Sequence, residues 1–337
     1  MLAFFANTKH YIDHLESIYK AVDTPKAFII PNSLKNYGQS KGLTDLIIFK
    51  SNSEFKSIFK RMYRKNKRNI KWVVVSYGNA KVVGQVAEYV ILLEHGAGQS
   101  YKSKTASWAR GKSSLIKNVQ LFLATNQHCH EAFISHNKGI KSEIVGCPKL
   151  DRYLEESKPY DKKEPKICFS WHWESRDVPE TRGSFFYWRD KVAELAENYK
   201  IAIHGHPRIQ NQTKRFAKLN GIEFIPDFED VIKTCDIYVC DNSSTLFEFA
   251  AMDKPVVVLN PPWYRKEVEH GLRFWEYADI GVQCDSPDMI AECIDKATRD
   301  HWMIRKRRNE HTEKIYPHLG GSVALIVKKL AEINKGR

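Results

Sequence analysis

The stretch YVCDNSSTLFEFAAMDKPVVVL, from Tyr238 to Leu259, reads as a buried strand, a polar turn, a helix and a second buried strand. Both apolar runs are short and rich in β-branched residues, which is typical of strands covered on both faces in a parallel sheet. Asn242 or Ser243 can cap the helix, and the amides of its first turn then favour a bound phosphate. Glu248, one turn further on, can reach the hydroxyl pair of a sugar. An ordinary capped helix is the simpler alternative.

The same alternation of short apolar runs and helical segments continues on both sides of this stretch. Strand candidates lie at 27–30, 45–49, 72–77, 89–95, 119–125 and 142–146, and further ones lie in KICFSW, YKIAIHG and IEFIP. A polar linker with two prolines, within 154–166, separates the two sets. The pattern predicts an α/β fold with two doubly wound, Rossmann-like domains at 1–156 and 164–302, and a helical tail at 303–337 that packs across both.

Composition limits the class of protein. The chain has 337 residues and 42% hydrophobic residues, enough for two globular cores. No apolar run reaches the ~20 residues that a membrane-spanning helix needs. The N-terminal sequence lacks the basic start and long apolar core of a secretory signal. Seven cysteines without a C-x-x-C pair agree with a reducing compartment, so we expect a cytoplasmic location.

The net charge of +13 favours anionic partners. Much of it lies in a basic helix predicted at 54–72, where Phe55, Ile58 and Phe59 recur at helical spacing among lysines and arginines. Two interpretations have equal support. The helix lies on the anionic inner face of the cell membrane, which makes the protein peripheral there, or its apolar stripe packs on its own domain and its basic face is solvated. Nucleic acid is a less favoured partner.

Polar motifs follow the predicted strands, where doubly wound domains bind ligands, so we expect them to face an interdomain cleft. The candidate residues are His95, Gly96 and Lys102 in LLEHGAGQSYK; Lys149 and Asp151 in VGCPKLDRY; Ser170, His172 and Arg176 in CFSWHWESRD; His204, His206 and Arg208 in IAIHGHPR; and Asp241, Asn242, Ser243, Ser244, Thr245 and Glu248 in YVCDNSSTLFE. No metal site is expected, because the HCH cluster at 128–130 lacks a second ligand pair at a zinc spacing.

Taken in order between Leu92 and Leu259, these motifs resemble the CDP-glycerol glycerophosphotransferase family of teichoic acid and capsule polymer enzymes. That family has an HG motif, a G-x-P-R-x-D motif, a P-T-x-R-like turn, an H-P motif, and D-Y-S-S followed by F-E and K-P. The resemblance implies a GT-B fold and transfer of a glycerol-phosphate or related polyol-phosphate group. The donor is CDP-activated, the acceptor is a hydroxyl of a lipid-linked or polymer molecule, and CMP is released. No metal or other cofactor is implied.

The resemblance also implies roles for individual residues. His95, in the acceptor domain, corresponds to a general base on the acceptor hydroxyl, and His206, in the donor-nucleotide domain, corresponds to a histidine that contacts the donor phosphates. Ser243, Ser244 and Glu248 correspond to the nucleotide-binding turn. The sequence departs from the family at Lys149, where arginine is usual, at Asn242, where tyrosine is usual, and at His172, where proline or threonine is common. Lysine replaces a bidentate contact with a point charge.

Two other functions fit the same features. A GT-B glycosyltransferase with a nucleotide-sugar donor would use the same helix N-terminus, and a DNA-modifying form of it would use the basic face for phosphates and flip out its target base. The other alternative is a membrane-associated module of GT-B shape without catalytic activity.

Overall fold

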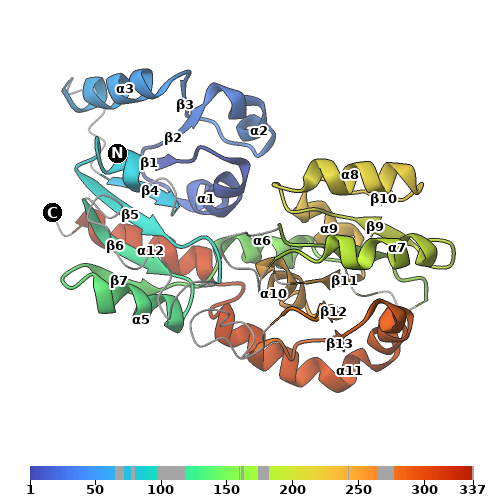
Figure 1. The fold of residues 1–337 in the computed structure, drawn as a ribbon. Helices are drawn as coiled ribbons and strands as arrows, with labels where there is room; N and C mark the ends of the chain where they lie inside the picture. The colour runs from blue at the N-terminus through green and yellow to red at the C-terminus, as the bar shows by residue number, and fades with distance from the viewer. Residues whose placement is uncertain are drawn as a thin grey trace. The chain divides into compact units, whose positions relative to one another are not determined.

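The computed structural model describes residues 1–64, 72–76, 80–97, 118–158, 160, 163–173, 182–241, 243–264 and 277–335. They form two compact units of strands and helices (Figure 1). Of the described residues, the first unit contains those within 1–97, 118–152 and 316–335, and the second contains those within 153–315.

The described strands of the first unit form one parallel sheet of order β3-β2-β1-β4-β5-β6-β7. They are β1 Leu2–Phe5, β2 Lys26–Pro31, β3 Leu46–Phe49, β4 Trp72–Ser76, β5 Tyr89–Leu93, β6 Val119–Ala124 and β7 Lys141–Ile144. The helices are α1 Lys9–Ala21, α2 Lys35–Ser40, α3 Asn52–Arg64, α4 Ala80–Val83, α5 Gln127–His136 and α12 Ser322–Lys335, with a short 3₁₀ helix η1 at Asn32–Leu34. Helix α6, Pro148–Glu156, begins in this unit and continues past the boundary at 152/153. Strand order reverses between β1 and β4, as in doubly wound sheets.

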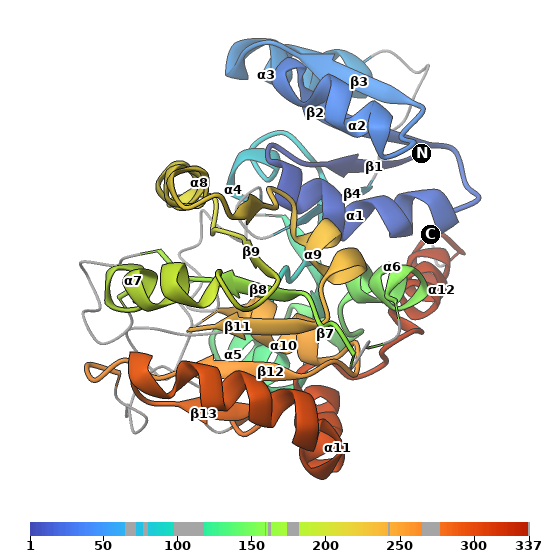
Figure 2. The same ribbon diagram turned by 90° about the vertical axis from the view of Figure 1, so that its right-hand side faces the viewer.

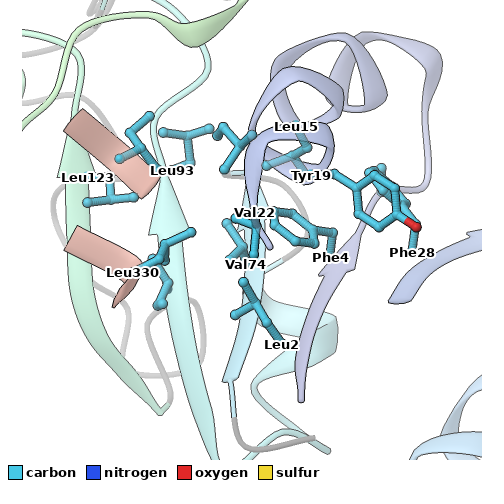
Figure 3. Packing of buried hydrophobic residues seen from close by; sticks show 14 of the residues in the cluster. Leu2, Phe4, Leu15, Tyr19, Val22, Phe28, Val74, Leu93, Leu123 and Leu330 are labelled. Carbon is cyan, nitrogen blue, oxygen red and sulfur yellow. The ribbon is translucent and has the colours of Figure 1, made fainter. Parts of the chain in front are cut away.

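Helices cover both faces of this sheet. One face, which carries Leu2 and Phe4 of β1, packs against α1 and α12 through Leu15 and Leu330, and Figure 3 shows these side chains together. The alternate residues of the same strand pack against α3, α4 and α5 on the opposite face. Because both faces are buried, the strands read as continuous apolar runs rather than as alternating ones.

The C-terminal helix α12 is held to the first unit by the VGCPKLDRY motif. Asp151 accepts hydrogen bonds from the amides of Gly320 and Val323 at 2.9 and 2.8 Å, which satisfies donors at the N-terminus of α12. Gly146 has φ +79°, and a Cβ there would lie 2.2 Å from the carbonyl oxygen of Pro317. The glycine and the aspartate of this motif therefore dock the end of the chain.

The second unit has its own parallel sheet, of order β10-β9-β8-β11-β12-β13 among the described residues. Its strands are β8 Ile167–Ser170, β9 Ile201–Ile203, β10 Glu223–Phe224, β11 Ile237–Cys240, β12 Val256–Leu259 and β13 Val282–Cys284. Its helices are α7 Phe185–Leu195, α8 Gln210–Leu219, α9 Phe228–Thr234, α10 Ser244–Ala250 and α11 Ile290–Ile315, with a 3₁₀ helix η5 at Pro287–Met289. The order reverses between β8 and β11.

This second sheet is also covered on both faces. Trp188 of α7 and Ile294 of α11 join one buried cluster with Val239 of β11, and Figure 2 shows α11 along β12 and β13. Tyr238, which points to the other face, stacks on Phe249 of α10 at 5.2 Å and lies 5.6 Å from Phe228 of α9. The Rossmann-like topology predicted from the sequence is thus present in each unit.

The structure differs from the sequence-based expectations at three places. Strand β1, at the centre of the first sheet, was not predicted, because four apolar residues at the chain start carry no turn signal before them. Strand β13 was also missed. The units divide at 152/153 and 315/316 rather than near 156–164 and at 302, since α11 runs unbroken from Ile290 to Ile315.

Candidate functional site

The structure brings three of the predicted motifs to one end of the second sheet. β8 lies between β9 and β11, so the residues that end or follow these strands share the carboxyl edge at the switch point, where doubly wound sheets bind ligands. We call this set the switch-point cluster. It contains Ser170 and His172 after β8, His204, His206 and Arg208 after β9, and Asp241, Ser243, Ser244 and Thr245 after β11.

Asp241 organises the backbone at this edge. Its side chain is buried, Oδ1 accepts from the amide of His172 at 2.7 Å, and Oδ2 accepts from the amide and hydroxyl of Ser184 at 3.0 and 2.8 Å. Burial raises the pKa of Asp241 to about 6, against the effect of these hydrogen bonds. The carboxylate that the sequence suggested for donor binding therefore holds both ends of the segment between β8 and α7.

Two histidines lie side by side in this cluster. The ring centroids of His172 and His206 are 5.4 Å apart. Burial, and then the neighbouring His206, lower the pKa of His172 to about 3, and burial, and then Arg208, lower the pKa of His206 to about 4. The Arg208 amide donates to Nδ1 of His206 at 3.2 Å, which places the proton of this neutral ring on Nε2. His206 therefore presents an uncharged N–H donor near pH 7.

We expect His172→Gln to reduce the acid sensitivity of the fold. The folded-state pKa of about 3 lies below the ~6.5 of an unfolded histidine, so the unfolded chain binds the extra proton and stability falls as the pH drops. From pH 7 to 5 this residue alone removes about 2 kcal/mol. Asp241 acts in the opposite direction, because its folded pKa of about 6 exceeds its unfolded value.

Urea unfolding of wild type and variant at pH 7 and pH 5 measures this difference. The wild type should lose more unfolding free energy than His172→Gln over that interval. Equal losses in the two proteins would contradict the assignment of His172 as a histidine that is neutral in the folded state.

His204 ties two loops of the second unit together. Its Nδ1 donates to the carbonyl oxygen of Ile225 at 3.0 Å, and burial lowers the pKa of the ring, which leaves it neutral. The next residue, Gly205, has no room for a side chain, because a Cβ would lie 2.1 Å from Oγ1 of Thr213 in α8. In the HGHP motif, His204 and Gly205 are thus held in place by packing and hydrogen bonding, whereas His206 is more accessible.

The helix expected after β11 is α10, and Ser243 is its N-cap. The Ser243 hydroxyl accepts from the amide of Thr245 and lies 2.8 Å from the Thr245 hydroxyl, which is 2.9 Å from the hydroxyl of Tyr238. Ser170 also bonds to Tyr238. Glu248 is buried on α10. This is the capped helix that the sequence predicted, and phosphate binding at its first turn stays a prediction.

Lys254, in the K-P motif, stabilises the fold. It is buried, and its Nζ donates to the carbonyl oxygens of Ile232 and Cys235, at 2.7 and 3.0 Å, at the C-terminus of α9. We expect Lys254→Met to lower the unfolding free energy by about 1–3 kcal/mol, because these carbonyls lose their partner. Denaturant unfolding measures this. Affinity for CDP should stay at the wild-type value. Loss of CDP affinity with unchanged stability would contradict the structural role of Lys254.

His95 lies at the carboxyl end of β5 in the first unit, beside a buried acid. Oε1 of Glu94 accepts from the His95 amide at 2.9 Å and lies 3.0 Å from Nδ1 of the ring. Glu94 is 3% exposed, while the His95 side chain is 28% exposed. A carboxylate close to Nδ1 leaves the other ring nitrogen, Nε2, for a substrate proton, as a general base requires.

Three rings from α1 surround His95. The centroids of His10 and Tyr11 lie 5.4 Å from it, and that of His14 lies 6.2 Å from it. His14 is buried, and burial followed by the charge of Lys149 lowers its pKa well below the usual range. In the described part of the chain, no group of three or more histidine, cysteine, aspartate or glutamate side chains is placed to hold a metal ion.

The other predicted residues of the first unit differ from His95 in burial or in what they contact. Lys149 is buried near His14, and Asp151 binds the amides of α12 as described above. Gly96 has open space around the position of a Cβ. Lys102, Arg176 and Asn242 lie outside the described residues.

The basic segment predicted at 54–72 is represented by α3. Phe55 and Ile58 are buried in the core, and the Phe55 ring lies 4.9 Å from Phe5 and 5.2 Å from Phe49. Residues 65–71 lie outside the described residues. At the two described positions the apolar stripe packs on its own unit. Among the helices that the structure describes, none has both the length and the apolar character to cross a membrane.

Sequence reasoning missed several neighbours of the candidate residues. Glu94 stood in the quoted EHG motif, and an acid directly before a histidine is the signal that could have drawn attention to it. His10 and His14 are spaced i and i+4 in one helix, which places them on one face. Trp173 follows His172 and carried no recognisable signal.

Two α/β units, each built on a parallel sheet with polar residues at its carboxyl edge, are typical of the GT-B class of fold. Residues 185–330 match the profile of a family described as CDP-Glycerol:Poly(glycerophosphate) glycerophosphotransferase. This match confirms the family resemblance seen in the motifs. Among curated proteins, the minor teichoic acid biosynthesis protein GgaB of Bacillus subtilis is 24% identical over 305 residues, which cover 82% of this chain. The chain spans about a third of that relative, 32% of its length.

Solved structures confirm the fold class. The wall teichoic acid polymerase TagF matches with a TM-score of 0.68 and 14% identity, over 100% of this chain and 89% of the other. The UDP-GlcNAc 2-epimerase of Neisseria meningitidis, bound to UDP-GlcNAc, matches with a TM-score of 0.62 and 15% identity, over 98% and 99% of the two chains. At these identities the similarity shows the fold alone.

Proposed function

We propose that this protein transfers a glycerol-phosphate or related polyol-phosphate group from a CDP-activated donor to a hydroxyl of a lipid-linked or polymer acceptor in cell-surface glycopolymer synthesis. One observation carries the proposal. Most of the family match over residues 185–330 falls on the second unit, in which His206 and Arg208 lie at the switch-point edge. A relative named for teichoic acid biosynthesis supports the same chemistry, and the polymerase TagF among the solved structures supports the fold that this chemistry uses.

The second unit supplies the donor site in this proposal. Arg208 brings a positive charge and His206 a neutral Nε2–H, and both suit the oxygens of a diphosphate. Asp241 holds the loop after β8 in place beside them. No metal ion is required, because these donors offset the charge that develops on the leaving phosphate. Retention of transferase activity in EDTA tests whether the reaction proceeds without a metal ion.

The first unit supplies the general base. Nε2 of His95 takes the proton of the acceptor hydroxyl while the hydroxyl oxygen forms a bond to the β-phosphorus. The bond from that phosphorus to the bridging oxygen breaks, and CMP leaves with the electron pair. Glu94 keeps Nδ1 of His95 oriented, so that Nε2 faces the substrate. Proton transfer of this kind contributes about 10²–10⁴ in rate.

The test is incubation of the purified protein with CDP-glycerol, CDP-ribitol and UDP-sugars, with and without an acceptor ending in glycerol phosphate. CMP release that depends on a CDP donor and rises with acceptor is the expected result. UDP release from UDP-sugars alone would contradict the polyol-phosphate transfer and favour a GT-B glycosyltransferase, which the fold similarity to a UDP-GlcNAc-bound epimerase also accommodates.

The proposed partners are the nucleotide-activated donor and the lipid-linked or polymer acceptor. Contact with an anionic membrane surface through 54–72 is a further proposal, which needs Phe55 and Ile58 to stay in the core while the basic side chains meet the headgroups. Sedimentation with vesicles containing phosphatidylglycerol, against neutral vesicles, tests it.

A further inference from the structure

Trp173 and Arg208 form a stacked pair in the second unit. Cζ of Arg208 lies 4.0 Å from the centroid of the Trp173 ring. The indole is half-buried and the arginine is exposed. Among the residues that the structure describes, no carboxylate pairs with this guanidinium. Its charge is therefore held on an aromatic face and not neutralised there.

The position of the pair is fixed from both sides. Trp173 follows His172, whose amide is bonded to the buried Asp241 at 2.7 Å. Arg208 is linked through its amide to Nδ1 of His206 at 3.2 Å, and the rings of Trp173 and His206 are 6.3 Å apart. The two loops follow β8 and β9, which are paired neighbours in the sheet.

A guanidinium stacked on an indole keeps its edge available. The face of the cation interacts with the ring, while its N–H groups point outward in the plane, where they can bind phosphate oxygens in a bidentate manner. An arginine without such a support loses more side-chain entropy when it orders around a ligand. The ring therefore prepares Arg208 for an anion beside the Nε2–H of His206.

We propose that Trp173 is a positioning residue for nucleoside diphosphate binding, which holds the Arg208 guanidinium in place to grip the diphosphate. This inference rests on the proposed function, because it assigns the ligand to the same donor site. It adds a residue that none of the motifs contains as a ligand. Trp173 acts through Arg208 and not through contact with the reacting atoms.

A double-mutant cycle on the full chain tests the inference. CDP and CMP dissociation constants are measured by calorimetry for wild type, Trp173→Leu, Arg208→Gln and the double variant. Cation–π stabilisation of about 0.5–2 kcal/mol predicts that Trp173→Leu weakens CDP binding about two- to thirtyfold. CMP, with one phosphate, should be affected less. Trp173→Phe, which keeps an aromatic face, should recover most of the affinity.

In the Arg208→Gln background, Trp173→Leu should have no further effect on CDP binding. An equal loss with and without Arg208 would overturn the inference, because the indole would then act on the ligand or the fold directly. Unchanged CDP affinity of Trp173→Leu would also overturn it. If wild type binds UDP but not CDP, the proposed donor is wrong, and the cycle is run with UDP. Binding of neither nucleotide would overturn both proposals.

Discussion

Replacement of His95 by alanine is expected to lower kcat for CMP release by about 10³-fold. The loss follows from removal of the group that we propose takes the acceptor proton, since an unassisted hydroxyl is a poor nucleophile at neutral pH. Binding of CDP should not change, because His95 belongs to the first unit and the donor residues to the second. Steady-state kinetics of CMP release, with calorimetry of CDP binding, measure the two effects separately.

Two further variants sharpen this experiment. Glu94→Gln keeps the shape of the side chain that lies beside Nδ1 of His95, and the loss of its charge should lower kcat about 10- to 100-fold. His136→Ala, on the exposed end of α5, is the matched control and should retain wild-type turnover. Wild-type turnover by His95→Ala would mean that this histidine has a structural role and that the base lies elsewhere.

Asp241→Ala should produce the largest loss of stability. The carboxylate accepts three hydrogen bonds from His172 and Ser184, and each buried donor left without a partner costs about 1–3 kcal/mol. We therefore expect the unfolding free energy to fall by about 3 kcal/mol or more. Donor binding should be lost as well, because the loop that carries His172 and Trp173 is no longer held. Denaturant unfolding and CDP calorimetry provide the measurements.

Ser184→Ala separates the contributions at this carboxylate. It removes the hydroxyl donor and keeps the amide, so it should cost about 1 kcal/mol and leave CDP binding nearly intact. A small stability loss for Asp241→Ala, combined with abolished CDP binding, would instead indicate that Asp241 contacts the ligand, as the sequence motif alone suggested.

The doubly wound fold class could be predicted from the sequence because buried parallel strands carry a strong local signal. Runs such as VVVS at 73–76 and VVVL at 256–259 are short, apolar and bounded by polar turns. β1 has the same character but begins at the second residue, so no boundary marks it. The C-terminal end of α11 could not be predicted from the sequence either, because a polar helix face does not indicate where one unit ends and the next begins.

Position after a strand predicted which residues gather at the switch point, but not what each one does. Asp241 bonds to His172, 69 residues earlier, and Lys254 bonds to the carbonyl of Ile232, 22 residues earlier. Such pairings depend on how loops approach one another in space, which local pattern does not encode. A motif residue can therefore contact a ligand, support the backbone or do both, and in the structure Asp151, Asp241 and Lys254 each hydrogen-bond to backbone groups.

The location of α12 has a consequence for the order in which the chain folds. Ile326 and Leu330 complete the core of the first unit, yet they are translated after all of residues 153–315. At ribosomal rates of 5–20 residues per second, the N-terminal sheet waits roughly ten to thirty seconds for the helix that covers it. During that time an apolar face of the sheet is open to chaperones or to other nascent chains. The first unit thus cannot complete its core until all of the second unit has been synthesised.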